Sequence, residues 1–128
     1  MASKWEIFYI QSCRYAKPNP KDKFVLIAYI DPFSHGFFIN SSINNYIVKR
    51  PYLLSCEAKI LSSQHHFLNH DSYVDCREIF RFDDSELTNT RGVLSADGQA
   101  EVINAVASCP VLEQIHKNRI LTDTPSTG

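Results

Sequence analysis

A nearly unbroken apolar run, KFVLIAYI from Lys23 to Ile30, constrains the fold of this chain more than any other feature. Such residues favour a β-strand, and their continuous apolar surface has to be buried. The following DPFSHG carries the turn residues Pro32 and Gly36, and GFFINSSI then returns as a second apolar segment. This order predicts two strands that pair antiparallel as a hairpin.

Three further segments have strand character. WEIFYIQSC, from Trp5 to Cys13, is aromatic and β-branched and ends at the proline-containing loop YAKPNPKDK. SCEAKILSS, residues 55–63, is the second, and the third ends at Phe82. NNYIVKRPYLL, residues 44–54, mixes apolar residues with proline, which predicts a connection with at most an edge strand. DDSELTNTRG, after Phe82, predicts a loop, with a hairpin partner strand around Leu87 as the alternative.

The last third of the chain has helical character. Ser95 suits an N-cap, and the apolar residues Val102, Ile103 and Val106 recur at helical spacing, which predicts a helix from Ala96 to Ser108. Pro110 favours the start of a second helix. That helix is expected to share one apolar face among Val111, Leu112 and Ile115. The polar residues 122–128, TDTPSTG, predict a disordered tail.

Composition limits the class of protein. With 128 residues, 44% of them hydrophobic, we expect a single domain over residues 1–121. The net charge of −1 excludes a global positive field, so any nucleic acid would need a local basic patch. The N-terminus resembles neither a signal peptide nor a membrane span, which predicts a cytoplasmic protein without membrane contact.

The cysteines are predicted to be reduced. Cys13, Cys56, Cys76 and Cys109 form no CxxC pair, and a domain of this size does not need disulfides. Cys76 has the apolar parity of its strand, so we interpret it as a small core residue rather than a nucleophile.

The stretch HHFLNHDSYVDCREIFRF, from His65 to Phe82, combines polar clustering with alternation. The period-2 pattern predicts one apolar strand face, made of Val74, Cys76, Phe80 and Phe82. It predicts one polar face, made of Tyr73, Asp75, Arg77 and Arg81. The histidines stand at the start of this strand, where they could form a site or a turn.

Short strands followed by helices predict a mainly β α+β domain, and a partly closed antiparallel barrel would bury KFVLIAYI. The hairpin, the strand HDSYVDCREIFRF and the segment RGVLSADGQAEVINAV (Arg91 to Val106) together resemble the MazF/PemK toxin family of SH3-like barrels. The resemblance spans about Lys23 to Val106. It implies a toxin-like fold, a homodimer, a cognate antitoxin partner and metal-independent cleavage of single-stranded RNA without a cofactor.

The chain departs from the family at the implied catalytic positions. Where active relatives carry an arginine-proline step, this chain has Asp22 and Lys23, and lysine lacks the bidentate fork of arginine. Arg50 in KRP matches the step locally but lies late in the chain. Ser42, like Ser41, stands near the family's hydroxyl position and could equally be a strand-end hydrogen-bonding residue.

The residue chemistry adds candidates of its own. Metal-free RNA cleavage needs a base, an acid and a cation, and His70 beside Asp71 could transfer protons near neutral pH. Alternatively, Asp71 caps a turn while His70 bonds to backbone.

Tyr73, Arg77 and Arg81 could stack on and neutralise single-stranded RNA, or could be a solvated strand face. A zinc site from His65 or His66 with His70, Asp75 and Cys76 lacks a second paired arm, so no metal site is predicted.

Two functions follow from these observations. The first is a toxin-like endoribonuclease in which Lys23 or Arg50 supplies the cation and His70 transfers protons. The second is a catalytically inactive SH3-like barrel that acts as a protein-interaction module.

Overall fold

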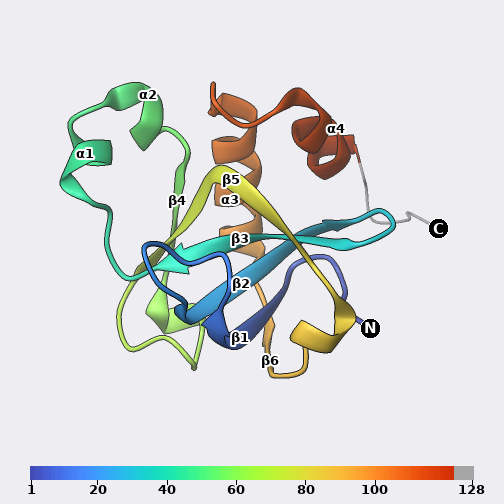
Figure 1. Cartoon of the computed structure of the whole chain (residues 1–128). Coiled ribbons are helices and arrows are strands. Elements are labelled where there is room, and N and C mark those ends of the chain that lie inside the picture. Colours follow the sequence, from blue (N-terminus) through green and yellow to red (C-terminus); the bar gives the residue numbers. More distant parts are fainter. Residues whose placement is uncertain (123–128) are drawn as a thin grey trace.

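The computed structural model describes residues 1–122 and consists of one curled antiparallel sheet with helices (Figure 1). The six strands lie in the order β4-β5-β3-β2-β1-β6. They are β1 (Glu6–Cys13), β2 (Lys21–Ile30), β3 (Ser34–Asn40), β4 (Glu57–Ile60), β5 (Ser72–Phe82) and β6 (Thr90–Val93). The prediction of a mainly β α+β fold with an SH3-like, partly closed barrel and C-terminal helices is confirmed.

Strand β2 lies between β1 and β3 and is buried on both faces. Val25, Leu26, Ile27 and Ala28 have no exposed surface. Leu26 and Ala28 belong to one hydrophobic cluster, whereas Val25 and Ile27 belong to the other. The absence of polar alternation in KFVLIAYI therefore reflects a strand that is covered on both sides.

The cluster that contains Leu26 is the helix-side core, because it includes Val102 and Val106 of α3 (Ala96–Ser108). Ser95 caps α3 by accepting a hydrogen bond from the Gly98 backbone N–H at 3.0 Å, as predicted. Figure 1 shows α3 behind the sheet, with α4 (Gln114–Thr122) beside it. Within residues 1–122, no helix is long and apolar enough to cross a membrane.

The opposite face of the sheet carries the loop-side core. Its buried members come from the N-terminus, β1, β2, β5 and the loop after β5: Ala2, Phe8, Ile10, Cys13, Val25, Ile27, Phe82 and Leu87. Phe38 and Phe80 pack against this cluster and are only partly buried. The loop-side face therefore ends in a rim of partly exposed aromatic rings.

The single alternation predicted for β5 is wrong, because the strand changes face partway along. Phe38 pairs with Asp75 while Gly36 pairs with Phe80, so β5 holds three more residues than β3 across this interval. An odd insertion reverses which side chains face each side. Val74 and Cys76 thus join the helix-side core, whereas Phe80 and Phe82 lie on the loop side.

The connection after β3 contains two short helices and no edge strand. These are α1 (Asn45–Val48) and α2 (Pro51–Leu54). The Asn44 side chain accepts a hydrogen bond from the Ile47 N–H, and proline stands at the first position of α2. Capping and proline geometry outweigh the apolar content here.

Two helical turns and the late helix also differ in detail from expectation. One-turn 3₁₀ helices occupy Ser62–Gln64 (η1) and Asp84–Glu86 (η2). The second C-terminal helix begins at Gln114 rather than at Pro110, and Val111 and Ile115 are exposed while Leu112 is buried. The predicted disordered tail lies outside the described residues, except for Thr122, which ends α4.

The prediction of four reduced cysteines is wrong for two of them. Cys56, just before β4, forms a disulfide with Cys109, which caps the C-terminus of α3. The two residues are 53 positions apart in sequence, so their spacing gives no sign of the pairing. Cys13 and Cys76 are buried free thiols, and burial raises the pKa of the Cys76 thiol, as expected for a core residue.

The disulfide sets the number of reactive thiols that should be found before and after reduction. Denatured protein without reductant should expose two thiols, from Cys13 and Cys76, and reduction should raise the count to four. Because the bond closes a long loop, reduction should lower the free energy of unfolding by about 2–5 kcal/mol in urea titrations. A Cys13→Ala control should keep this sensitivity to reductant. Four reactive thiols before reduction would contradict the pairing.

Gly36 occupies a position at which any side chain would lower the stability of the fold. A Cβ there would lie 2.6 Å from Val25 Cγ1 and 2.9 Å from the Leu26 carbonyl oxygen. Gly36→Ala should therefore lower the free energy of unfolding by about 1–3 kcal/mol, measured by chemical denaturation. Val93→Ala, on an exposed position of β6, should change it by less than about 0.5 kcal/mol. Equal stability of the two variants would contradict this packing.

Candidate functional site

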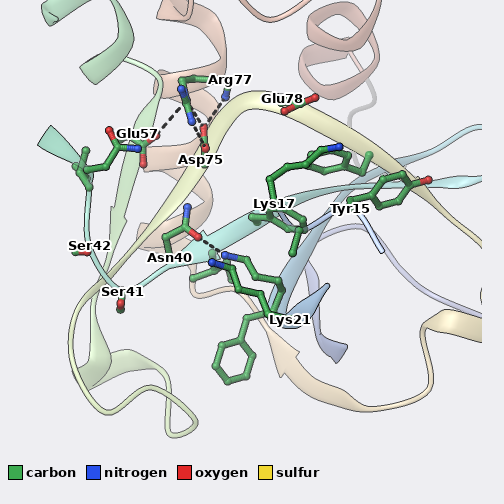
Figure 2. Close-up of a pocket in the computed structure, with 18 of the residues that line it drawn as sticks. Tyr15, Lys17, Lys21, Asn40, Ser41, Ser42, Glu57, Asp75, Arg77 and Glu78 are labelled. Carbon is green, nitrogen blue, oxygen red and sulfur yellow. Dashed lines mark hydrogen bonds and ion pairs between the residues drawn. The ribbon is translucent and has the colours of Figure 1, made fainter. Parts of the chain in front are cut away.

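A cavity of about 790 Å³ opens at the start of β2, and we call it the main cavity. Its walls come from the β1–β2 connection, the end of β3 with the chain after it, α1, β4 and β5 (Figure 2). Its lining is unusually rich in charge for so small a surface. The charged residues are Lys17, Lys21, Asp22, Lys23, Glu57, Asp75, Arg77 and Glu78.

Strand register explains why residues distant in sequence meet here. Phe38 is paired with Val25 on one side and with Asp75 on the other, and Asp75 is paired with Glu57. Directly paired residues share a face of an antiparallel sheet. The partly exposed Phe38 and the two carboxyl groups therefore lie in one row across the loop-side face.

Lys23 stands next to this row and is held in place from two sides. Its ammonium group donates a hydrogen bond to Asn40 Oδ1 and lies 4.8 Å from the centroid of the Phe38 ring. Burial and the neighbouring Lys21 lower the pKa of Lys23, while Asp75 opposes this shift. The main cavity thus holds a half-buried cation whose position is defined.

Aromatic rings form a stack along the cavity. Tyr15 and Phe80 are stacked with centroids 4.8 Å apart, and Phe80 and Phe38 are stacked with centroids 4.7 Å apart. Their interplanar angles are 26° and 28°. Flat aromatic surface beside a cation is the combination with which proteins bind single-stranded nucleic acid.

A carboxyl pair with one arginine forms the wall toward β4. Arg77 binds Asp75 in a bidentate manner, with Nε to Oδ1 at 2.9 Å and Nη2 to Oδ2 at 2.8 Å. Glu57 Oε2 lies 3.9 Å from Arg77 Nε. The Glu57 side chain is 3% exposed, and its Oε2 has no hydrogen-bond partner among the described residues. Figure 2 shows this trio on one side of the cavity, with Tyr15 and Lys17 on the other.

Glu57 is the most perturbed carboxyl group of the site. Burial, reinforced by the negative charge of Asp75, raises its pKa from 4.5 to about 8. Arg77 opposes this shift, but its guanidinium already satisfies Asp75. Burial and the neighbouring Asp75 therefore favour the protonated form of Glu57.

Three of the residues predicted from sequence line the main cavity: Lys23, Ser42 and Arg77. Ser41 and Ser42 also line a second hollow of about 530 Å³, together with His70, Asp71 and Tyr73. The residues after β3 are thus a shared rim between the two spaces. His70 and Tyr73 therefore line the second hollow, which Ser41 and Ser42 separate from the main cavity that holds Lys23.

The carboxylate of Asp71 is bonded to Ser62, and it is the Asp71 carbonyl oxygen that contacts the imidazole of His70. Its Oδ1 accepts hydrogen bonds from the Ser62 N–H at 2.9 Å and the Ser62 hydroxyl at 3.2 Å, which lowers the pKa of Asp71. The Asp71 carbonyl oxygen lies 3.0 Å from His70 Nδ1. This geometry matches the turn-capping alternative for the two residues.

His65 has a structural place in the same stretch. Its Nδ1 lies 2.7 Å from the Leu61 carbonyl oxygen, and its Nε2 accepts a hydrogen bond from the Ser95 N–H at 3.1 Å. The ring is buried and links η1 to the start of α3. Within residues 1–122, no three His, Cys, Asp or Glu side chains are grouped so that they could hold a metal ion.

Two predicted arginines lie outside the main cavity. Arg50 lies over the Tyr46 ring at 3.6 Å and donates a hydrogen bond to the Tyr46 carbonyl oxygen at 2.8 Å. Arg81 lies beyond the change of face in β5, and its guanidinium is 4.5 Å from the Phe33 ring. The shared face predicted for Arg77 and Arg81 is therefore wrong.

Sequence reasoning missed several residues of the main cavity. Lys17 and Lys21 stand in the loop KPNPKDK, whose repeated lysines were a usable signal. Glu57 gave no such signal, because only the pairing of β4 with β5 brings it to Asp75. Tyr15 likewise reaches Phe80 only through the fold.

Comparisons with known proteins give evidence on the fold alone. Neither protein-family models nor curated protein sequences match this chain. Among solved structures, the chain is similar to the Mycobacterium tuberculosis toxin MazF-mt6, with a TM-score of 0.60 and 18% sequence identity. The match covers 84% of this chain and 98% of the toxin chain. The chain therefore has a MazF-like toxin fold, as its sequence resemblance predicted.

Proposed function

We propose that this chain is a toxin-like endoribonuclease that binds and cleaves single-stranded RNA in the main cavity. The observation that carries the proposal is the meeting of a half-buried cation, a hydroxyl rim and a stacked aromatic surface in one cavity of a MazF-like fold. Fold likeness alone does not assign an activity, so the proposed RNA cleavage is argued from these side chains.

Binding is assigned to the side of the cavity near Tyr15. Lys17 and Lys21 attract phosphates, and the partly exposed Tyr15–Phe80 stack, with the Arg14 guanidinium 4.3 Å from the centre of the Tyr15 ring, offers aromatic surface and charge for a base. Arg77 and Tyr73 extend this surface toward the second hollow. Because the whole chain carries a net charge of −1, attraction of RNA depends on this local group.

Cleavage is assigned to the region around Lys23 and Ser42. The 2′-hydroxyl loses its proton to a base, its oxygen attacks phosphorus, the P–O5′ bond breaks and O5′ takes up a proton, which leaves a 2′,3′-cyclic phosphate. Lys23 stabilises the negative charge that develops on the phosphorane, and the Ser42 hydroxyl bonds a phosphate oxygen. His70, across the rim, is the proposed proton-transfer group because imidazole is the most common general acid and base in enzymes.

The biological setting follows from the same proposal. The chain would act in the cytoplasm as the toxin of a toxin-antitoxin pair, as a homodimer that a cognate antitoxin inhibits. The solved structure it resembles is a toxin by name, which supports this setting without identifying a partner.

One observation favours a second function, a protein-interaction module without catalysis. Tyr46, Tyr52 and Val111 are about half exposed and border a hollow of about 600 Å³ between α1, α2 and the chain before α4. Clustered exposed aromatic side chains are typical of protein-binding surfaces. RNA binding without cleavage, or neither activity, would favour this alternative.

The central prediction is RNA scission that depends on Lys23. Purified protein should cleave a mixed single-stranded RNA in excess EDTA and leave cyclic phosphate ends. Lys23→Ala should slow cleavage by about 10²–10³-fold, because it removes the cation at the developing charge. Lys117→Ala, on α4 and outside the main cavity, is the matched control and should retain full activity.

The same assay tests the other assigned residues. Ser42→Ala and His70→Ala should each slow cleavage by about 10-fold or more. Full activity of His70→Ala would remove His70 from the mechanism, while Lys23→Ala would still test the site. Intact RNA with wild-type protein under all conditions would reject the proposed endoribonuclease.

A further inference from the structure

The sign of the charge in the main cavity depends on a single proton. Of the described residues that line it, four are basic and four are acidic. The basic ones are Lys17, Lys21, Lys23 and Arg77, and the acidic ones are Asp22, Glu57, Asp75 and Glu78. With every group ionised the lining is neutral, and one protonated carboxyl group makes it positive. A neutral lining would give an anionic ligand little attraction.

The strand pairing identifies the carboxyl group that holds this proton. Glu57 and Asp75 are direct partners across β4 and β5, where two like charges disfavour each other. Asp75 has both oxygens bonded to Arg77, whereas Glu57 Oε2 is buried without a hydrogen bond. Ionisation of Glu57 would therefore leave a buried carboxylate whose nearby cation, Arg77 with Nε at 3.9 Å, is already bonded to Asp75.

We propose that the Glu57–Asp75 pair takes up a proton when the main cavity binds an RNA phosphate, so that Glu57 sets the upper pH limit of binding. Glu57 is a positioning residue in this scheme, because it acts through the charge that Arg77 and the lysines present to the ligand. This inference rests on the proposed function for the identity of the ligand.

The charged groups around Glu57 determine the pH at which it loses its proton. Burial and Asp75 raise the pKa of Glu57 to about 8, and Arg77 is the opposing charge on β5. Cys76, on β5, is a buried thiol whose own pKa is raised partly by Glu57. From β2, Lys23 faces Asp75, while α1 contributes the uncharged Ile47 to the lining. A bound phosphate adds negative charge and thereby favours the protonated form further.

Linkage gives the direction and size of the effect. A ligand that binds the protonated form better must draw a proton from solution, up to about half a proton per ligand at pH 8. Affinity should fall by about 3–10-fold between pH 7 and pH 9 at constant ionic strength. Below pH 7 Glu57 already carries the proton, so its contribution to the pH dependence should vanish.

The test is calorimetric titration with a single-stranded oligoribonucleotide whose 2′-oxygens are methylated, so that it cannot be cleaved. Titrations at pH 8 in buffers of different ionisation enthalpy measure the protons taken up. Wild-type protein should show proton uptake and the fall in affinity between pH 7 and pH 9, and Glu57→Gln should lose the uptake at pH 8 and most of that fall. Glu78→Gln is the matched control because it removes a carboxylate from the same cavity. It should raise affinity at every pH and keep the proton uptake.

Lys23 needs its own control, since its pKa is also lowered and it loses charge as pH rises. Lys23→Arg stays charged throughout this range. If proton uptake persists in Lys23→Arg and disappears in Glu57→Gln, the inference holds. Uptake that persists in Glu57→Gln, or that disappears in Lys23→Arg, overturns it.

A ligand-free measurement separates this inference from the proposed function. Because the pKa of Glu57 is higher in the folded than in the unfolded chain, its contribution to stability is full below pH 4.5 and is lost as pH rises through about 8. The free energy of unfolding should therefore fall more steeply between pH 5 and pH 9 for wild type than for Glu57→Gln. Asp75→Asn removes the like charge that raises the pKa of Glu57. In this variant the loss of stability with rising pH should therefore begin at a lower pH than in wild type.

The two measurements distinguish failure of the proposed function from failure of the inference about Glu57. Failure of the oligoribonucleotide to bind at any pH would reject the proposed function, and the unfolding data would still decide whether Glu57 holds the proton. Equal pH dependence of stability in wild type and Glu57→Gln would overturn the inference even if the protein cleaves RNA.

Discussion

Burial of β2 on both faces is the constraint on which the rest of this structure depends. A strand without a polar face needs a cover on each side. Here α3 covers one side, and the curl of the sheet with the loop-side core covers the other. The first four residues of β2, from Lys21 to Phe24, emerge from this double cover, as does Ile30 at its other end. Polar chemistry can therefore gather at the start of β2, and the main cavity lies there.

The site illustrates how little a shared fold dictates about side chains. At 18% identity to the MazF-mt6 toxin, the backbone arrangement is common while most residues differ, and this chain places Lys23 near the start of β2. A lysine offers a point charge that its surroundings can shift, and these surroundings include the Glu57–Asp75 pair. Under the proposed function, ligand binding and the protonation of Glu57 would be coupled through neighbouring strands.

Local chemistry was predictable where neighbouring residues decide the outcome. The helix over 96–108 follows from the Ser95 cap and apolar spacing, and the β2–β3 hairpin follows from its turn residues. Arg81 shows the limit, because three extra residues in β5 reverse the faces. Glu78 on the apolar parity and Ile79 on the polar parity mark this break in the sequence, but they do not give its size. His70 and Asp71 show another limit. Their adjacency suggested an acid–base pair, yet the carboxylate of Asp71 accepts hydrogen bonds from Ser62, nine positions earlier in the chain.

The sequence by itself determined the class of fold, the central hairpin, the closing helix and the presence of Lys23 and Ser42 near one strand end. These depend on periodicity, turn residues and caps, which act within a few positions of the chain. Only the tertiary structure decided that Glu57 opposes Asp75, that Tyr15 stacks on Phe80 and that Cys56 joins Cys109. Such pairings depend on register between strands and on the docking of α3. No local pattern encodes either, because the partners meet only when the whole sheet has formed.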